Sequence, residues 1–411
     1  MRAEIGVGKQ KSEVEIQLPA SKSISNRVLI INALLSDPAP INNLSKAADT
    51  QILDRLLKSE LPIYDAGDGG TTARFLLAYC ALKGNACTIT GSESLQRRPV
   101  APLVDALNEL GAGISYVNNP GCLPVKLSGS KLHGGNVTVN GEISSQFISA
   151  LMLIAPLLPD GLKITLTGEI LSLPYIQMTA SVMHYFGVDV IVDGDQINIP
   201  SGNYSAKPFT VESDWSAASY WYEAVALSDG MEVVLPGLHQ NSLQGDSIIH
   251  TYMDSLGVET MFEDSGIRIR KKSNYRLPEY FTADFTGCPD IAPAIAVVCG
   301  AQNITADLTG LKNFRLKESD RASALQRELY NFNVKTDFCG GSKFKIYADS
   351  GLRMSRYTVK TYNDHRVAMC MSLLAAKVEK VIIADPEVVS KSYPDFYKDL
   401  SNAGFDVKFT K

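Results

Sequence analysis

Six long apolar segments run through the chain, and each begins with a short cluster of polar residues or glycines. Ser, Asp, Asn and Gly are favoured at helix N-termini, and segments that are apolar nearly all round form buried helices. The pattern therefore predicts six buried helices with polar starts. These helices are expected to begin at "SKSISNR", "DGGTTAR", "SSQF", "SDWSAAS", "CPDIAP" and "NDHR".

A second pattern also recurs: a helix end, a Gly or Asn turn, and a short alternating strand pair. Its turn residues follow one another at intervals of 70 to 76 residues, at Gly111, Gly187, Gly257, Asn333 and Gly404. A degenerate copy around "LDRLLKSELPIYDAG" brings the number to six. Such a period indicates repeated units of about two helices and several strands, which fill the chain. The strands "VEIQL" and "PFTVES" flank the first and fourth helices, so interdomain crossings are expected near residues 19 and 212.

Length and composition narrow the class of protein. A chain of 411 residues is expected to form two or three domains. The net charge of −5 argues against nucleic-acid or anionic-membrane partners, which need a broad basic surface. Apolar stretches too short to span a bilayer make the cytoplasm the expected location. The seven scattered cysteines are interpreted as reduced core thiols.

Basic residues gather locally although the chain is acidic. Lys22, Arg27, Arg74 and Arg366 stand at predicted helix starts, and Ser21 is a candidate N-cap. Others occur in compact polar phrases, namely Arg98, Arg315, Lys317, Arg321 and Lys391. Helix N-termini present unpaired N–H groups and partial positive charge, and Arg and Lys add full charges. This arrangement favours the binding of small, multiply charged anions.

The sequence lacks the motifs that are typical of several kinds of catalysis. "GVGKQ" departs from the phosphate-binding GxxxxGK[ST] loop, no two histidines have HExxH spacing, and no GxSxG occurs. Asp290 in "GCPDIAP" and Glu318 in "RLKESDR" are the carboxylates placed among cations. "KESDR" can equally be a solvated helix face, and His365 can be a helix cap.

The ordered phrases "PASKSISNR", "DGGTTAR", "RRP", "SSQF", "SLPY", "NFRLKESDR", "NDHR" and "SKSYPD" resemble those of the 5-enolpyruvylshikimate-3-phosphate synthase family. The resemblance covers the chain from about Lys22 to Lys391. It implies an inverted α/β barrel-like fold with six βαβαββ repeats, three in each of two domains, and an active site in the interdomain cleft. Residues 20–212 would bind shikimate 3-phosphate. Residues 1–19 and 213–411 would form the second domain and carry much of the phosphoenolpyruvate site.

The resemblance also implies a reaction. The carboxyvinyl group of phosphoenolpyruvate would pass to the 5-hydroxyl of shikimate 3-phosphate, with release of phosphate and without a metal or organic cofactor. Asp290 would be the base, and Glu318 or Lys22 would have a proton-transfer role. A monomer is expected, with no nucleic-acid or membrane partner.

The same resemblance assigns substrate contacts residue by residue. Shikimate 3-phosphate would meet Ser23, Arg27, Ser144, Ser145, Gln146, Ser172, Tyr175, Asn313 and Lys317. Phosphoenolpyruvate would meet Lys22, Gly70, Arg98, Gln146, Arg321, Arg366 and Lys391. Arg74 is expected to brace its helix start.

Two departures from the family pattern are visible. Asp68 and Gly69 stand where the family commonly has Asn and Ala, and Leu173 replaces the usual Lys of "SKPY". Asp68 either lies close to the anion site or pairs with a neighbouring Arg.

Two alternative functions are open. One is UDP-N-acetylglucosamine enolpyruvyl transferase, which usually has a reactive cysteine five residues before its "RP" arginine. That offset from Arg98 gives Glu93, and neither Cys87 nor Cys122 matches it. The other is a paralogue that binds anions without turnover.

Overall fold

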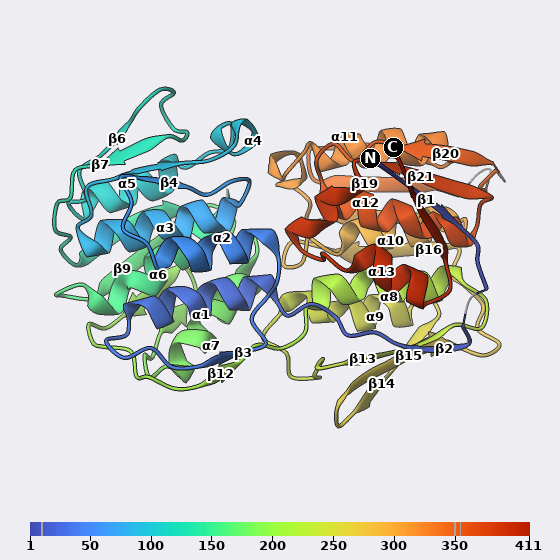
Figure 1. Ribbon diagram of the computed structural model, residues 1–411, viewed down its shortest axis with the longest axis horizontal. Coiled ribbons are helices and arrows are strands. Elements are labelled where there is room, and N and C mark those ends of the chain that lie inside the picture. The colour runs from blue at the N-terminus through green and yellow to red at the C-terminus, as the bar shows by residue number, and fades with distance from the viewer. Residues whose placement is uncertain (10, 143, 349–350, 354) are drawn as a thin grey trace. The chain divides into compact units, whose positions relative to one another are not determined.

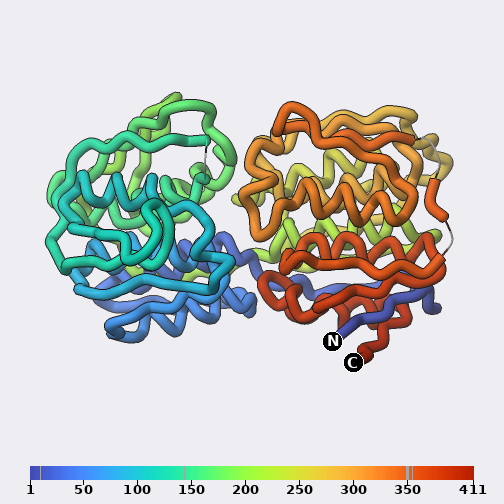
Figure 2. Tube along the Cα trace, turned by 90° about the horizontal axis from the view of Figure 1, so that it is seen from above, coloured from blue at the N-terminus to red at the C-terminus, as the bar shows by residue number. Residues whose placement is uncertain are grey.

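The computed structural model describes residues 1–9, 11–142, 144–348, 351–353 and 355–411. The chain divides into two compact units. Ala20–Val211 form one, called here the continuous unit, and Met1–Pro19 with Glu212–Lys411 form the discontinuous unit. In Figures 1 and 2 the continuous unit runs from blue to green, and the discontinuous unit is mainly yellow to red.

Two repeats of the continuous unit have the same order of elements: strand, helix, strand, helix and hairpin. The strands of each repeat form one sheet. The first two strands pair in parallel, and the hairpin adds to them in antiparallel orientation. One sheet uses β4 (Ile63–Asp65), α3 (Gly70–Lys83), β5 (Thr88–Thr90), α4 (Glu93–Gln96), α5 (Ala101–Glu109), β6 (Ile114–Tyr116) and β7 (Val125–Leu127). The other uses β8 (Gly135–Asn140), α6 (Ser145–Ile154), η1 (Ala155–Leu157), β9 (Leu162–Thr167), α7 (Leu173–Tyr185), β10 (Ile191–Asp193) and β11 (Gln196–Ile199).

The third repeat of this unit is shorter. Its sheet pairs β3 (Ile41–Asn42) with β12 (Phe209–Thr210), and its helices are α1 (Lys22–Leu34) and α2 (Ala48–Leu57). The strand pair predicted around "LDRLLKSELPIYDAG" is wrong. Residues 58–62 alone separate α2 from β4, so there is no room for a hairpin. Of the six expected repeats, this one lacks its last two strands within the described residues.

The discontinuous unit holds three four-stranded sheets in its described residues. The first repeat has β2 (Glu13–Glu15), α8 (Trp215–Leu227), β13 (Glu232–Pro236), η2 (Gly245–Ile248), α9 (Ile249–Asp254), β14 (Val258–Glu263) and β15 (Gly266–Lys271). The second has β16 (Tyr280–Asp284), α10 (Ala292–Ala301), β17 (Thr305–Thr309), η3 (Phe314–Leu316), α11 (Arg321–Asn331), β18 (Lys335–Cys339) and β19 (Lys343–Tyr347). The third has β20 (Arg356–Val359), α12 (His365–Leu373), η4 (Leu374–Ala376), β21 (Lys380–Ala384), η5 (Pro386–Lys391), α13 (Phe396–Asn402) and β22 (Asp406–Thr410).

The N-terminal strand β1 (Arg2–Gly6) completes this third sheet. It lies between β21 and β22 and is antiparallel to both, so Ile5 is opposite Val381 and Val407. In the other four-stranded sheets the last strand of the hairpin holds that position. The two ends of the chain are therefore hydrogen-bonded into one sheet, as their labels in Figure 1 indicate.

The first helix of every repeat is buried, and the three such helices of each unit contact one another. They are α1, α3 and α6 in the continuous unit and α8, α10 and α12 in the discontinuous unit. The prediction of six buried helices with polar starts is confirmed. Ser21, Ser144, Asp214 and Asp364 each accept a hydrogen bond from a backbone N–H of the helix that follows. These caps stabilise the helix starts where the candidate site residues lie.

The predicted turn residues have the backbone conformation that their position requires. The φ angles of Gly111, Gly187, Gly257, Asn333 and Gly404 are 95°, 88°, 85°, 67° and 96°. Gly and Asn tolerate this left-handed region far better than other residues do. The recurring turn thus ends the second helix of a repeat and starts the strand that follows.

All seven cysteines are free thiols, and five of them are buried. Cys339, at the end of β18, is exposed, so the interpretation of every cysteine as a core thiol is wrong at this position. Among the described helices, none combines the length and apolar character that a bilayer crossing needs.

Candidate active site

In the continuous unit, the predicted site residues lie at the starts of four helices, together with Arg98. Lys22 and Ser23 open α1, Gly70 opens α3, and Ser144 caps α6. The remaining ones are Arg27 on α1, Ser145 and Gln146 on α6, and Ser172 and Tyr175 at the start of α7. Helix starts carry partial positive charge, so this set is suited to anions.

Arg27 ties three of these helices together. Its Nε donates to Thr179 Oγ1 at 2.7 Å, and a terminal nitrogen donates to Ser149 Oγ at 3.0 Å. Two further N–H groups meet the carbonyls of Ser23 at 2.8 Å and Tyr175 at 3.2 Å. All four acceptors are neutral, and burial lowers the pKa of Arg27 to about 10. A guanidinium has five N–H donors, so one is left for a substrate.

Arg74 braces its helix start, as predicted. It donates to Gln146 Oε1 and to the carbonyl of Pro99, the latter at 3.1 Å. Its guanidinium also lies over the ring of Phe147, 4.7 Å from the ring centroid. Arg74 therefore fixes α3 to α6 and orients the amide of the candidate ligand Gln146.

Arg98 lies directly against the start of α3. An added Cβ at Gly70 would be 2.8 Å from one terminal nitrogen of Arg98, which explains the glycine at this position. The Nε of Arg98 is buried and has no hydrogen-bond partner among the described residues. A buried donor without an acceptor is costly, and a bound anion would satisfy it. Gly70 and Arg98 are thus brought together in a geometry that suits an anionic group.

Lys22 and Ser172 also have defined geometry in this set. Lys22 Nζ donates to Asp49 Oδ2 at 3.1 Å across the starts of α1 and α2. Ser172 has φ 62°, an uncommon conformation for a residue other than glycine. Such backbone conformations concentrate at functional sites.

The two departures from the family pattern have defined positions. Asp68 accepts a hydrogen bond from the hydroxyl of Ser92, the N-cap of α4. Leu173 is the first residue of α7.

In the discontinuous unit, Asp290 is surrounded by cations. Its Oδ1 is 3.2 Å from Arg321 and 3.4 Å from Lys317, and its Oδ2 is 2.9 Å from Arg366. Burial raises the pKa of Asp290, but Arg366, Lys317 and Arg321 together lower it by more, so the pKa is held well below the usual range. The helix start predicted at "CPDIAP" is not capped by this side chain, because the carboxylate binds the cations instead.

Arg321 is the centre of this cluster and is fully buried. Besides Asp290, it contacts Glu318 at 2.8 Å and Asp364 at 3.0 Å. The interpretation of "KESDR" as a solvated helix face is therefore wrong. Five predicted site residues come together here: Asp290, Lys317, Glu318, Arg321 and Arg366.

Asp364 belongs to the site and was not assigned a role from the sequence. It is fully buried, it pairs with Arg321, and it caps α12 by accepting from the backbone N–H of Arg366 at 3.0 Å. The signal was present, since an acidic residue directly before an apolar run is a favoured N-cap. Because Asp364 is the cap, the interpretation of His365 as the cap is wrong.

Asn313 and Lys391 complete the predicted set of this unit. Both are buried, with exposed fractions of 9% and 8%. The side-chain oxygen of Asn313 has no hydrogen-bond partner among the described residues. It is therefore available to a hydroxyl or another donor.

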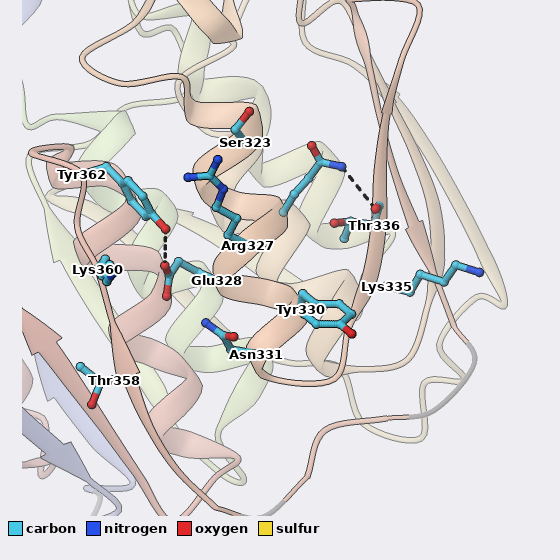
Figure 3. Close-up of a pocket in the computed structure, with 11 residues that line it drawn as sticks. Ser323, Arg327, Glu328, Tyr330, Asn331, Lys335, Thr336, Thr358, Lys360 and Tyr362 are labelled. Carbon is cyan, nitrogen blue, oxygen red and sulfur yellow. Dashed lines mark hydrogen bonds between the residues drawn. The ribbon is translucent and has the colours of Figure 1, made fainter.

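The described residues also form a groove in this unit, and they show no arrangement suited to a metal ion. In the described part of the chain, no three His, Cys, Asp or Glu side chains are arranged to hold a metal ion. A groove of about 610 Å³ lies between α11 and the strands beside it (Figure 3). Arg327, Lys335 and Lys360 line it, and the hydroxyl of Tyr362 donates to Glu328 at 2.6 Å. None of the predicted site residues lines this groove.

The fold and these two residue sets define an α/β protein of repeated units with buried cations at its helix starts. The profile of the EPSP synthase family (3-phosphoshikimate 1-carboxyvinyltransferase) matches residues 54–400. The chain belongs to this family, and the predicted family and enzyme class are confirmed.

Individual relatives agree with this membership. The 3-phosphoshikimate 1-carboxyvinyltransferase of Bacteroides fragilis is 43% identical over 96% of this chain and 96% of its own. The enzyme of that name from Vibrio vulnificus is 32% identical over 96% of this chain and 97% of its own. The solved EPSP synthase of Acinetobacter baumannii covers 100% of both chains with a TM-score of 0.77 and 19% identity. This last likeness supports the fold.

Proposed function

We propose that this chain transfers the carboxyvinyl group of phosphoenolpyruvate to the 5-hydroxyl of shikimate 3-phosphate and releases inorganic phosphate. Family membership supports the reaction. The observation that carries the proposal at the site is the cluster of Asp290 with Arg321, Arg366 and Lys317. Both substrates are multiply charged anions, and Arg and Lys bind such groups through charge-assisted hydrogen bonds.

The reaction moves two protons. In the first half, the 5-hydroxyl oxygen bonds to the central carbon of the donor, its proton passes to a base, and the methylene carbon gains a proton to become a methyl group. In the second half, the methyl group loses a proton and the bond to the phosphate oxygen breaks, which yields the enol ether and phosphate. Asp290 is the proposed base, and Glu318 or Lys22 is the proposed partner in proton transfer.

The cations around Asp290 link its basicity to donor binding. In the free chain they hold its pKa well below the usual range, and a carboxylate of that kind is a poor base. The phosphate and carboxylate of the donor compete for Arg321 and Arg366. As these cations turn to the donor, the pKa of Asp290 rises, so Asp290 becomes a base when substrate is present.

Roles are proposed for the remaining site residues as well. Ser144, Ser145 and Ser172 lie near the phosphate of shikimate 3-phosphate, and Gln146 and Tyr175 lie near its ring. Further contacts with this substrate come from Ser23, Arg27, Asn313 and Lys317. Lys22, Gly70, Arg98, Gln146, Arg321, Arg366 and Lys391 hold phosphoenolpyruvate. The proposed reaction draws on residues of both units. We further propose a monomer that works in the cytoplasm, which size-exclusion chromatography with light scattering and fractionation of cells would test.

The first test is phosphate release by the purified protein with phosphoenolpyruvate and shikimate 3-phosphate, in the presence of EDTA. A parallel reaction contains UDP-N-acetylglucosamine as the acceptor. Release with shikimate 3-phosphate alone is the expected result. Release with the UDP-sugar alone would assign the other enolpyruvyl transfer, and no release with either acceptor would indicate a paralogue that binds anions without turnover.

A further inference from the structure

Asp246 is another buried carboxyl of the discontinuous unit, and the charge of Asp290 acts on it. It belongs to η2, its exposed fraction is 2%, and its Oδ2 accepts a hydrogen bond from the hydroxyl of Ser216 on α8. Its Oδ1 is buried and has no hydrogen-bond partner among the described residues. A carboxyl in this state is either a costly buried anion or a neutral acid.

The loop before Asp246 is fixed to the start of α8. Gln244 accepts from the backbone N–H of Trp215 at 3.0 Å and donates to the carbonyl of Ser213 at 2.8 Å. A further bond joins Gln244 to Glu212 at 3.0 Å. The chain two residues before Asp246 is therefore held against the start of α8.

Charged groups from three directions act on Asp246. They are Asp214 at the cap of α8, Asp290 before α10 and Arg366 on α12. Burial, Asp290 and Asp214 together raise the pKa of Asp246 to about 7, although Arg366 and the bond from Ser216 act in the opposite direction. Ser216, which donates to Asp246, is one helical turn before Tyr220 on α8, and the hydroxyl of Tyr220 accepts a hydrogen bond from Arg366 at 3.5 Å. Asp246 thus changes its charge near neutral pH, close to the site that Arg366 and Asp290 form.

We propose that Asp246 is a positioning residue for donor binding, which gains or loses one proton and so sets how strongly Arg366 attracts the anionic donor. This inference rests on the proposed function. When Asp246 is neutral, Arg366 has Asp290 as its carboxylate partner and can turn to the donor. When Asp246 is ionised, a second negative charge acts on Arg366, and donor binding weakens. Affinity for phosphoenolpyruvate therefore falls as the pH rises through about 7.

The test is the KM for phosphoenolpyruvate between pH 5.5 and 9 in the wild type and in Asp246→Asn, whose amide keeps the size of the neutral acid. Dividing the wild-type KM by the variant KM at each pH cancels the effect of the ionisation of phosphoenolpyruvate itself. We expect the wild-type KM to rise by about tenfold more than the variant KM, the effect of one added charge near a cation. The expected change in kcat is smaller. Glu223→Gln replaces another fully buried acid of the same unit and should keep the wild-type profile.

A second variant covers the possibility that Asp246→Asn does not fold. Ser216→Ala removes the hydrogen bond that favours the ionised carboxyl, so the rise in KM should move to higher pH. Parallel KM profiles in wild type and Asp246→Asn would overturn the proposal, as would an unmoved midpoint in folded Ser216→Ala. A wild-type protein that releases no phosphate at any pH would instead overturn the proposed function.

Discussion

Gly70→Ala tests whether Arg98 binds the donor against the start of α3. The new Cβ would lie 2.8 Å from a terminal nitrogen of Arg98, whereas ordinary contacts begin near 3.4 Å, so the guanidinium must retreat by the difference. A hydrogen bond to a charged group contributes about 1.5–3 kcal/mol and depends steeply on distance. We therefore expect the KM for phosphoenolpyruvate to rise by about 10-fold to 100-fold.

Folding should not suffer from this substitution. Gly70 is the first residue of a helix, and the atoms that must move are the far end of a flexible side chain. With alanine in place of glycine the unfolded chain has less conformational entropy to lose on folding. The free energy of unfolding should therefore stay the same or increase by up to about 1 kcal/mol. Steady-state kinetics with each substrate varied in turn, combined with urea denaturation, separates the two effects.

A matched control is Gly202→Ala, since an added Cβ there meets no atom within 4 Å. This variant should keep both the stability and the kinetic constants of the wild type. A folded Gly70→Ala protein with an unchanged KM for phosphoenolpyruvate would refute the placement of the donor at Arg98.

Three further substitutions examine the buried charges of the discontinuous unit. Asp290→Asn should lower kcat by about 10²-fold to 10⁴-fold in the phosphate-release assay, because the proposed base is lost, and near-wild-type turnover would contradict that role. Asp364→Asn should lower the free energy of unfolding, measured by urea denaturation, by about 3–5 kcal/mol, because the fully buried Arg321 loses a charged partner. Asp406 is exposed, so the control Asp406→Asn should lower it by less than about 0.5 kcal/mol. Burial holds the pKa of Glu223 well above its ordinary value of 4.5, so the folded chain keeps a proton that the unfolded chain releases, and stability falls as the pH rises above that value. Glu223→Gln should remove up to about 1.4 kcal/mol of this fall per pH unit, and equal Tm values for wild type and variant at pH 8.5 would contradict it.

Much of the fold follows from local signals. Polar caps such as Ser144 and Asp214 stand directly before apolar runs, so both the position and the burial of the helices are encoded in short stretches. The turn residue Gly187 likewise marks the change from helix to strand through its own conformational freedom. The missing hairpin before β4 shows where local signals fail. The segment there resembles the other turns in sequence, but it is too short to form two strands.

Motif order names candidates for the site, but it does not give their arrangement. Motif order names Asp290, Arg321 and Arg366, yet their ion pairs depend on contacts between segments 31 to 76 residues apart. Arg27 shows the same limit, since its acceptors Ser149 and Thr179 come from helices far along the chain. The Oδ1 of Asp246 is buried without a hydrogen-bond partner among the described residues because of three-dimensional packing, which no local pattern specifies.

The pairing of β1 with β21 and β22 has a consequence for biosynthesis. Within this sequence β1 is made before β21 and β22, so both of its edges stay unpaired until those two strands have been made. Ala20–Val211 are complete long before that and can fold during translation, as domains generally do. A premature stop that removes β22 would leave the early strand with one exposed edge, which is a template for aggregation. This sheet therefore makes the stability of β1 depend on the completion of β21 and β22.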